Sequence, residues 1–592
     1  MIDRFKLFGN KSDDIKSIIA FGSAALTSSD KYSDLDLIIF TSDPLKYIND
    51  ADLEWVDELG EVISRLVVKD IVAHMKVNKL IMKDGPSLDL LIVDVKEFTQ
   101  VKNYLLAETP LQLPENLIRL INNYIYDFHY YLKRGYQIVF DTIDIQKIIN
   151  LVFKHEAGSE DKDMILSEER FNGLWNQFWQ NCYKMNTWLI GDELAYANIM
   201  VDNILKRNLI LLIQWYTLLE TNDKNLDVFY YGAKLKQWCD PKLYLALFNV
   251  FPNAGEDEVR DAVLQTMQIY IKLSNHIALK KEFNPNRLLE KQVYNAFMEK
   301  QLIGTVTDLK EITIPLYKLP EGEDDVDAIF ISDNGLCSKD GSLLEIDCFL
   351  ITTNCYKYTK HDTWRKSFKD NLSLSNAEGA FGVVVNILLK NGCCINVNVI
   401  NNLHLTKNDN HFQQNFDQIL NNGIELIHAK EEILETILHR YQDAPKHFLA
   451  GQADAKRFYN NYKRFWHTAN KMAAKLMRQD FYYAIVVLDN SMKNQLIKMM
   501  EWHAAIHHPV KNIYPQAKKI QQWCDPEFYA GLLRNFPHSD INTMFQSLVG
   551  EVELYRKISH ELAYTCGFKL NAELENSVLD TILECVHVFE EK

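Results

Sequence analysis

The stretch FGSAALTSSDKYSDLDLIIF, residues 21–40, places a Gly-Ser pair ahead of two aspartates that open an apolar run. If LDLIIF is a strand, Asp34 and Asp36 project from one face while the alternating leucines face the core. Two acids on one face repel each other unless a cation lies between them, and Mg²⁺ held by carboxylate and phosphate oxygens provides one. At the preceding turn, Gly22 permits a close backbone approach and Ser23 can cradle a phosphate.

A third acid opens another apolar strand in the segment KDGPSLDLLIV, where Asp89 follows an Asp-Gly turn. A third carboxylate beside a metal pair can serve both as a ligand and as the base for an attacking hydroxyl. The sequence therefore predicts a catalytic Mg²⁺ site formed by Asp34, Asp36 and Asp89, with Gly22 and Ser23 holding phosphate.

The chain also repeats itself. LKQWCDPKLYLALFNVFPNA, from Leu235, returns as IQQWCDPEFYAGLLRNFPHS, from Ile520, and YQIVFD near residue 140 pairs with IELIHA near residue 427. The Phe178-Trp179 pair returns as Phe465-Trp466 within longer matching segments. We therefore predict a tandem duplication of a unit of about 290 residues. The two copies are called the first and the second repeat.

Each repeat divides again. Its first part alternates short apolar strands with polar turns, and the remainder consists of long stretches with apolar residues at every third or fourth position. This pattern predicts an α+β domain followed by an α-helical bundle, twice over. The predicted domains are residues 1–105, 106–305, 306–405 and 406–592.

The composition restricts the partners. With 47% hydrophobic and 24% charged residues and no apolar stretch of membrane-spanning length, the chain is expected to be soluble and to avoid membranes. Ten cysteines without a CxxC pair fit reduced thiols, so we expect a cytoplasmic location. The net charge of −16 argues against nucleic-acid binding and suits a small cationic substrate.

Several segments resemble the streptomycin (aminoglycoside) 6-adenylyltransferase family of the nucleotidyltransferase superfamily. The Gly-Ser turn, the paired acids and the third strand-borne acid have the arrangement of the DNA polymerase β-like palm. EWVDELGEVIS…KLIMKDGPSLDLLIV and QFWQNCYKMNTWLIGDELAYANIMVDN resemble this family more closely. The matching residues are Trp55, Gly60, Glu61, Asp84, Gly85, Asp89, Phe178, Trp179, Leu189, Asp192 and Glu193. The resemblance covers nearly all of the first repeat and, more faintly, the second.

The resemblance implies a nucleotidyltransferase domain followed by a helical domain, with ATP and Mg²⁺ as co-substrate and cofactor. It implies transfer of AMP to a hydroxyl of an aminoglycoside such as streptomycin, and hence antibiotic resistance. The Gly-Ser pair would bind the nucleotide, and the three aspartates would bind metal. Asp192 and Glu193 would bind the cationic groups of the acceptor; alternatively, they are ordinary first-turn acids of an exposed helix.

Three departures from the family pattern concern positive charge. Where the family usually has Arg directly after Gly-Ser, this chain has Ala24. Where the family tends to have Arg between Asp-Gly and the third acid, this chain has Pro86, Ser87 and Leu88. Where the family has Trp-Arg before Asp-Glu, this chain has Ile190-Gly191. The charges that would hold a triphosphate or the acceptor are therefore fewer than in the family pattern.

The second repeat retains only part of the site. Glu345 and Asp347 stand at the positions of Asp34 and Asp36, and Asn396 stands at the position of Asp89. Asp333-Asn334 replaces Gly22-Ser23, and Gln479-Asp480 replaces Asp192-Glu193. A neutral amide cannot serve as a base, so we expect a catalytically inactive copy. It would pack on the first repeat as an intramolecular pseudo-dimer within a monomer, or alternatively complete or regulate the substrate cleft.

Two other functions remain open at this stage. The first is the same chemistry on a different acceptor, such as a nucleotide, another antibiotic or a protein side chain. The second is a non-catalytic binding or sequestering protein derived from the family, in which the missing arginines mark a loss of activity.

Overall fold

The structure is a computed structural model that describes most of the 592 residues. The described ranges are 1–22, 34–49, 54–68, 75–83, 86–107, 113–155, 165–222, 228, 232–252, 255–306, 308–337, 343–360, 364–368, 371–379, 381–406, 412–413, 416–417, 419–420, 423–443, 454–508, 513–514, 517–536 and 540–590. Ser23, Ala24, Asp84 and Gly85 lie outside these ranges.

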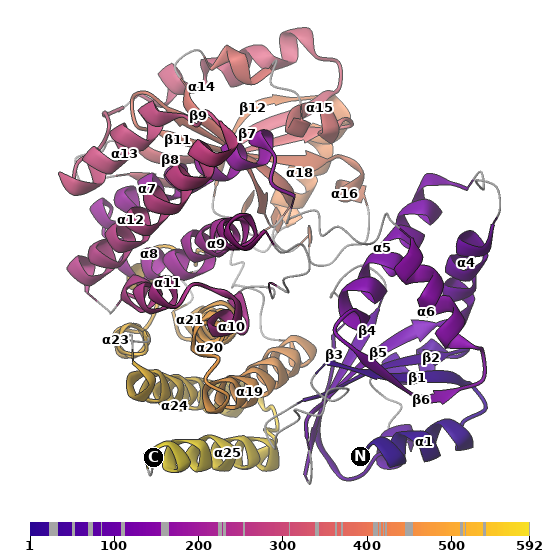
Figure 1. Cartoon of the computed structure of the whole chain (residues 1–592). Coiled ribbons are helices and arrows are strands. Elements are labelled where there is room, and N and C mark those ends of the chain that lie inside the picture. Colours follow the sequence, from indigo (N-terminus) through magenta and orange to yellow (C-terminus); the bar gives the residue numbers. More distant parts are fainter. Residues whose placement is uncertain are drawn as a thin grey trace. The chain divides into compact units, whose positions relative to one another are not determined.

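The chain forms two compact bodies that do not follow the order of the repeats (Figure 1). Body 1 comprises Met1–Ile165, Lys456–Ala484 and Lys569–Lys592, and body 2 comprises Leu166–Ala455 and Ile485–Phe568. Each body therefore combines segments of both repeats. The two bodies are described separately.

Body 1 contains a six-stranded mixed sheet in the order β3-β4-β5-β2-β1-β6. Its strands are β1 (Ile15–Phe21), β2 (Leu35–Thr41), β3 (Val62–Val68), β4 (Lys76–Met82), β5 (Leu88–Asp94) and β6 (Tyr136–Asp141). Only β2 and β5 run parallel, and the other neighbours are antiparallel. Because β6 pairs with β1, this sheet extends beyond the boundary predicted near residue 105.

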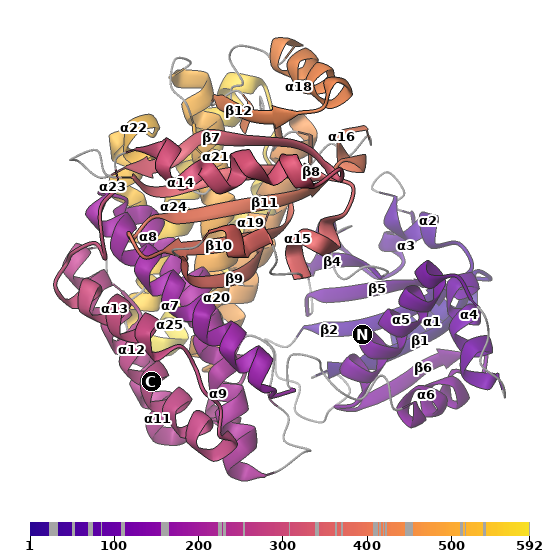
Figure 2. The ribbon, with the colours of Figure 1, turned by 90° about the horizontal axis from the view of Figure 1, so that it is seen from above.

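Helices cover both faces of this sheet, which explains why its central strands are almost continuously apolar. One face packs against α1 (Ile2–Lys11), α2 (Pro44–Ile48) and α3 (Glu54–Asp57), with Trp55 and Tyr47 in the core. The other face packs against α4 (Val95–Leu106), α5 (Glu115–Leu132) and α6 (Ile145–Lys154) (Figure 2).

Two helices of the second repeat complete body 1. They are α19 (Ala455–Met477) and α25 (Ala572–Glu590). In α19, His467 Nε2 lies 3.0 Å from Ser64 Oγ of β3. At the start of α25, Asn571 Nδ2 donates to the carbonyl oxygen of Ile63 at 3.3 Å. The α+β domain of the first repeat is thus packed against helices from the second repeat.

Body 2 contains a second six-stranded sheet in the order β12-β7-β8-β11-β10-β9. Its strands are β7 (Val326–Cys337), β8 (Leu343–Thr352), β9 (Asn371–Gly379), β10 (Gly382–Leu389), β11 (Cys394–Asn401) and β12 (Ile424–Ala429). Read from β9, this is the order of the first sheet, and the corresponding pair β8 and β11 is again parallel. The identical topology confirms the predicted duplication.

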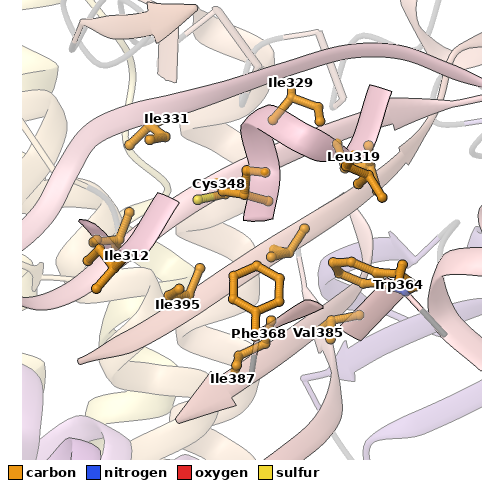
Figure 3. Close-up of a cluster of buried hydrophobic side chains, with 14 of the residues drawn as sticks. Ile312, Leu319, Ile329, Ile331, Cys348, Trp364, Phe368, Val385, Ile387 and Ile395 are labelled. Carbon is orange, nitrogen blue, oxygen red and sulfur yellow. The ribbon is translucent and has the colours of Figure 1, made fainter. Parts of the chain in front are cut away.

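The second sheet is also covered on both faces. On one face, α14 (Leu309–Lys318) and α15 (Cys355–Lys360) enclose an apolar core that includes Cys348, Trp364 and Phe368 (Figure 3). The opposite face packs against α16 (Leu403–Thr406), α18 (Glu431–Asp443) and the segment around Phe416.

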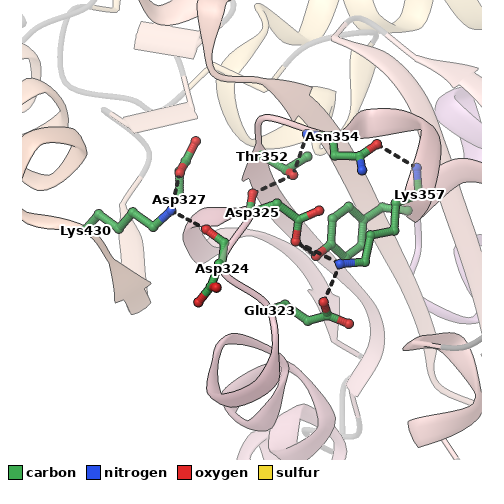
Figure 4. Close-up of polar contacts among 9 residues, drawn as sticks. Glu323, Asp324, Asp325, Asp327, Thr352, Asn354, Lys357 and Lys430 are labelled. Atoms are coloured by element: carbon green, nitrogen blue, oxygen red, sulfur yellow. Dashed lines mark hydrogen bonds and ion pairs between the residues drawn. The ribbon is translucent and has the colours of Figure 1, made fainter.

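A matched set of polar contacts anchors the same corner of both sheets. In body 2, Lys357 Nζ donates to Asp325 Oδ1 at 2.9 Å, and Thr352 Oγ1 donates to the Asp325 carbonyl oxygen at 2.7 Å (Figure 4). In body 1, Lys46 Nζ donates to Asp14 Oδ1 at 3.1 Å and Thr41 Oγ1 donates to Asp14 Oδ2 at 2.9 Å. These contacts fix the helix after β2 or β8 to the residue that precedes β1 or β7.

The rest of body 2 is helical and comes from both repeats. The longer helices are α7 (Glu168–Ile190), α8 (Leu194–Met200), α9 (Lys206–Thr221), α12 (Glu256–Lys281), α13 (Arg287–Met298), α21 (Lys493–His507), α23 (Pro526–Arg534) and α24 (Ile541–Cys566). Along the chain, body 1 ends and body 2 resumes within α20 (Phe481–Val487). Helix α7, from the first repeat, packs against β9 of the second. The described helices include none with the length and apolarity to cross a membrane. All ten cysteines lie within the described residues, and none forms a disulfide.

Candidate active site

The central pair of the candidate site lies on the parallel strands of body 1. Asp36 of β2 and Asp89 of β5 are direct partners in the strand register. Asp34 precedes β2, and the side chains of all three aspartates are half-buried. The structure therefore brings the three predicted acids together at the amino-terminal ends of two neighbouring strands. This location follows from the parallel pairing, which places the starts of β2 and β5 at the same edge.

Gly22 directly follows β1, lies beside this pair and has a positive φ of 67°. A Cβ atom at this position would lie 2.9 Å from Asp36 Oδ2. Glycine is therefore needed both for the backbone conformation and for the close approach of the Asp36 carboxylate. Its neighbour in the predicted phosphate turn, Ser23, lies outside the described residues.

Lysines surround the three carboxylates. Lys79 of β4 forms an ion pair with Asp89, with 2.5 Å between Nζ and Oδ2. Lys471 and Lys475, one turn apart on α19, also act electrostatically on Asp34. The site thus combines a sheet from the first repeat with cations from a helix of the second repeat.

The pKa values of the three acids diverge. Burial and the nearby Asp89 carboxylate raise the pKa of Asp34, and burial with Asp89 and Asp34 raises the pKa of Asp36 to about 8. Burial also opposes ionisation of Asp89, but Lys79 and Lys471 outweigh it and hold the pKa of Asp89 below its usual value. The site therefore holds one readily ionised carboxylate next to two whose negative charge is disfavoured, and a further cation would stabilise their ionised forms.

These carboxylates fit Mg²⁺ by their chemistry, because hard divalent cations prefer oxygen donors and multiple negative charges. Within the described ranges, no group of three His, Cys, Asp or Glu side chains has the spacing of a metal site. The Lys79 ammonium, paired with Asp89, supplies positive charge to the cluster.

The corresponding cluster of body 2 has the register that the sequence alignment predicts. Asp347 of β8 pairs with Asn396 of β11, as Asp36 pairs with Asp89, and Glu345 lies two residues before Asp347. β7 continues through residues 333–334 to Cys337, whereas β1 ends at Phe21. The second repeat therefore continues as extended strand where the first repeat has ended its strand.

Two lysines bind the polar groups of this second cluster directly. Lys518 Nζ lies 3.3 Å from Glu345 Oε1 and 3.4 Å from Asp347 Oδ2. Lys184 Nζ, from α7, donates to the side-chain oxygens of Asn386 and Asn396 at 2.8 and 2.7 Å. The buried Glu345 and the half-buried Asp347 are thus accompanied by two buried lysines, and the cluster is compensated by the chain itself.

Hydrogen bonds complete this compensation. Asn396 Nδ2 donates to Asp347 Oδ1 at 2.8 Å, and Trp188 Nε1 donates to Glu345 Oε2 at 3.0 Å. Burial opposes ionisation of Glu345, but Lys518 and Lys184 hold the pKa of Glu345 below its usual value. The second cluster is an internal ion-pair network.

The predicted acceptor-binding residues Asp192 and Glu193 belong to body 2. The Glu193 side chain is buried and accepts a 2.7 Å hydrogen bond from the backbone N–H of Lys519. The Asp192 carbonyl oxygen accepts from Gln521 Nε2 at 2.6 Å. Burial raises the pKa of Glu193. Glu193 is thus not an exposed first-turn acid, and the three aspartates lie in the other body.

Sequence reasoning missed the cations of both clusters. Lys79 faces Asp89 across an antiparallel register, which alternation along β4 could have indicated. Lys184 and Lys471 occupy the same position of the repeated Phe-Trp helix, five or six residues after that pair. Lys518 has no such counterpart, because the matching residue of the first repeat is Ala233.

Acids on neighbouring strands beside a glycine turn are the arrangement expected of an enzyme that handles metal-bound phosphate. The family model for streptomycin adenylyltransferase matches residues 1–300 and again 337–584. The chain therefore belongs to this family, and the double match confirms both the resemblance and the duplication. Family membership supports nucleotidyl transfer as the chemistry.

The other two comparisons add little. A crystal structure of an aminoglycoside 6-adenyltransferase from Bacillus subtilis matches 47% of this chain and 99% of its own, with 14% identity and a TM-score of 0.24. No curated protein matches the sequence.

Proposed function

We propose that the first repeat transfers AMP from Mg-ATP to a hydroxyl of a cationic, aminoglycoside-like acceptor such as streptomycin. The observation that carries this proposal is the register pairing of Asp36 with Asp89, with Asp34 beside them. Lys79 compensates Asp89, but the ionised forms of Asp34 and Asp36 are disfavoured by burial and by the neighbouring carboxylates, and a cationic ligand would stabilise them. Membership of the streptomycin adenylyltransferase family supports the same chemistry.

In this proposal Asp34 and Asp36 hold Mg²⁺ and Asp89 completes the site. The ion, when bound, neutralises the triphosphate and the departing pyrophosphate. Asp89 is the acid most readily ionised at neutral pH, because its pKa is lowered. It can therefore accept the proton of the acceptor hydroxyl while the hydroxyl oxygen bonds to the α-phosphorus and the bond to the β-phosphate oxygen breaks.

Gly22 and Ser23 are proposed to hold the phosphates of the nucleotide. Gly22 supports this role because a Cβ atom at this position would come too close to the Asp36 carboxylate. A small residue at a strand end leaves backbone N–H groups accessible to phosphate.

The acceptor is proposed from the charge of the chain. The net charge of −16 favours a cationic molecule. Asp192 and Glu193 remain the predicted acceptor ligands, but the Glu193 carboxylate is already bound by Lys519 N–H. This contact favours, as a second candidate, the same transfer to a different small molecule, nucleotide or protein hydroxyl. A cytoplasmic location and a monomeric state also remain predictions.

Pyrophosphate release tests the proposal. Purified protein with ATP, Mg²⁺ and streptomycin should release pyrophosphate, and Asp89→Asn should reduce the rate by about 10²-fold or more. Asp94→Asn, at the cap of α4, is a control on the same strand. A panel of aminoglycosides and nucleotides then identifies the acceptor. ATP binding without turnover on any of them would instead indicate a non-catalytic binding protein.

A further inference from the structure

The packing of α19 raises the question of which repeat completes the candidate active site. In body 1, His467 of α19 contacts Ser64 of β3. In body 2, Gln180 of α7, at the position of His467, is likewise hydrogen-bonded to a serine of the facing edge strand, Ser375 of β9. Each sheet is therefore packed against the Phe-Trp helix of the other repeat, and the exchange is reciprocal.

The second contact in this interface lies next to the acids. Asn470 Nδ2 of α19 donates to Ser87 Oγ at 3.1 Å, and Ser87 is two residues before Asp89. The following residue, Lys471, acts electrostatically on all three aspartates. Helix α19 therefore directs a lysine toward the start of β2 and β5.

The two lysines at this helix position are used differently. Lys184 Nζ is bound by Asn386 and Asn396 and is buried. Lys471 is half-buried and lies within ion-pair distance of none of the described carboxylates. Its ammonium interacts electrostatically with the Tyr483 hydroxyl most strongly and then with all three acids, and it forms an ion pair with none of the described carboxylates. A cation in this position remains able to bind an anion brought to the site.

We propose that the active site of the first repeat is composite: α19 of the second repeat completes it, and Lys471 contacts the phosphates of the bound nucleotide. This inference rests on the proposed function. It gives the second repeat a direct part in the reaction site of the first. It also identifies one source of the positive charge that Ala24 and the segment 86–88 lack.

A matched pair of variants tests the role of Lys471 in the full chain. Lys471→Met removes the charge and keeps the length of the side chain, so KM for ATP should rise about tenfold or more, and Lys471→Arg should restore most of the affinity. Lys184→Met, at the same position of the other repeat, should leave KM within about twofold. The reason is that Lys184 belongs to the network of body 2.

Nucleotide binding separates this inference from the proposed function. If the wild type binds Mg-ATP without turnover, weaker binding by Lys471→Met and unchanged binding by Lys184→Met still support the composite site. Equal ATP affinity of Lys471→Met and wild type would overturn it, as would a larger loss in Lys184→Met. Failure of the wild type to bind any nucleotide would overturn both the inference and the function.

Engineered disulfides test the exchange of helices directly. Cysteines replacing Ser64 and His467 should cross-link on oxidation, as should cysteines replacing Ser375 and Gln180. The mixed pair Ser64→Cys with Gln180→Cys should not, because Gln180 is held at Ser375. Efficient cross-linking of the mixed pair would show that each sheet packs on the helix of its own repeat, and the composite site would be wrong.

Discussion

The two carboxylate clusters occupy the same point of two sheets with the same strand order, and they differ in how charge is compensated. In body 2, Lys518 and Lys184 bind the acids and amides directly, so the network needs no ligand. In body 1, Asp34 and Asp36 are disfavoured as anions by burial and by their neighbours.

This difference shows which residues the fold requires. The corner contacts of Asp14 and Asp325 are the same in both sheets, so they serve the architecture. The acids at the start of β2 have counterparts at the start of β8, in the same strand register. Ionisation is disfavoured for Asp34 and Asp36, whereas lysines favour the ionised form of Glu345. Uncompensated charge that is kept in one repeat only indicates a ligand-binding site, because selection for stability alone would remove such charge.

The largest expected effect concerns the matched acids Asp36 and Asp347. Asp36→Asn should reduce pyrophosphate release by about 10²-fold or more, because the acid proposed to hold Mg²⁺ is lost. Asp347→Asn should leave the rate unchanged, since its carboxylate belongs to the network of body 2. Equal losses of activity in both variants would break the distinction between the clusters.

The next effect is on stability. Lys518→Met should lower the free energy of unfolding by about 3–5 kcal/mol, because Glu345 and Asp347 lose the ammonium that compensates them in a buried site. Urea unfolding measures this change. Lys519→Met is the control: its ammonium lies over the Tyr514 ring, a contact worth about 1 kcal/mol. A similarly small effect of both variants would show that the second cluster is not held by Lys518.

A smaller effect is expected at the turn that only the first repeat retains. Gly22→Ala should cost about 1–2 kcal/mol, because a residue with a Cβ is strained at positive φ. The new methyl group would also displace Asp36, so activity should fall by more than the stability change explains. Gly173→Ala in α7 is the control, because no atom lies within 4 Å of its added Cβ and alanine favours a helix. Unchanged turnover in Gly22→Ala would argue against the phosphate turn.

The smallest effect concerns another position where the repeats differ, Glu551 beside the buried Lys493–Asp489 pair; its counterpart in the first repeat is Thr266. Burial raises the pKa of Glu551 to about 7 from an ordinary value of 4.5. The folded state therefore keeps this proton while the unfolded state loses it, and stability falls as pH rises from about 4.5 to 7.

Glu551→Gln lacks this titration. Its stability relative to wild type should therefore increase steadily across that pH window. Thermal unfolding at several pH values measures the trend. Asp489→Asn should instead destabilise at every pH, because Lys493 loses a partner 2.6 Å away. A pH-independent difference between Glu551→Gln and wild type would contradict the assignment.

Much of the fold could be read from local pattern. Apolar strands, the repeated Trp-Cys-Asp-Pro segment and the Phe-Trp helices predicted two α+β domains and their helical partners, and both sheets are present. The alignment of Glu345, Asp347 and Asn396 with the three aspartates is matched by the strand registers. Alternation along a strand sets which side chains share a face, so this level of detail is local.

The domain limits were harder to predict because a sheet can recruit a strand from far along the chain. β6 joins the first sheet after two helices, and β12 joins the second in the same way. The repetition of YQIVFD as IELIHA pointed to a shared role for these segments, but their pairing with β1 and β7 depends on tertiary contacts.

The sequence alone determined the duplication, the alternation of side chains along each strand and the correspondence between the acids of the two repeats, because these follow from periodicity and spacing along one chain. The tertiary structure decided that each sheet packs on the helix of the other repeat. It also decided that Lys518 and Lys184 compensate one cluster while Lys471 faces the other. The two repeats carry nearly the same Phe-Trp helix, α7 and α19. Because the apolar faces of these helices are similar, the sequence pattern does not indicate which sheet each helix packs against. Only side-chain contacts in the folded chain distinguish the two pairings.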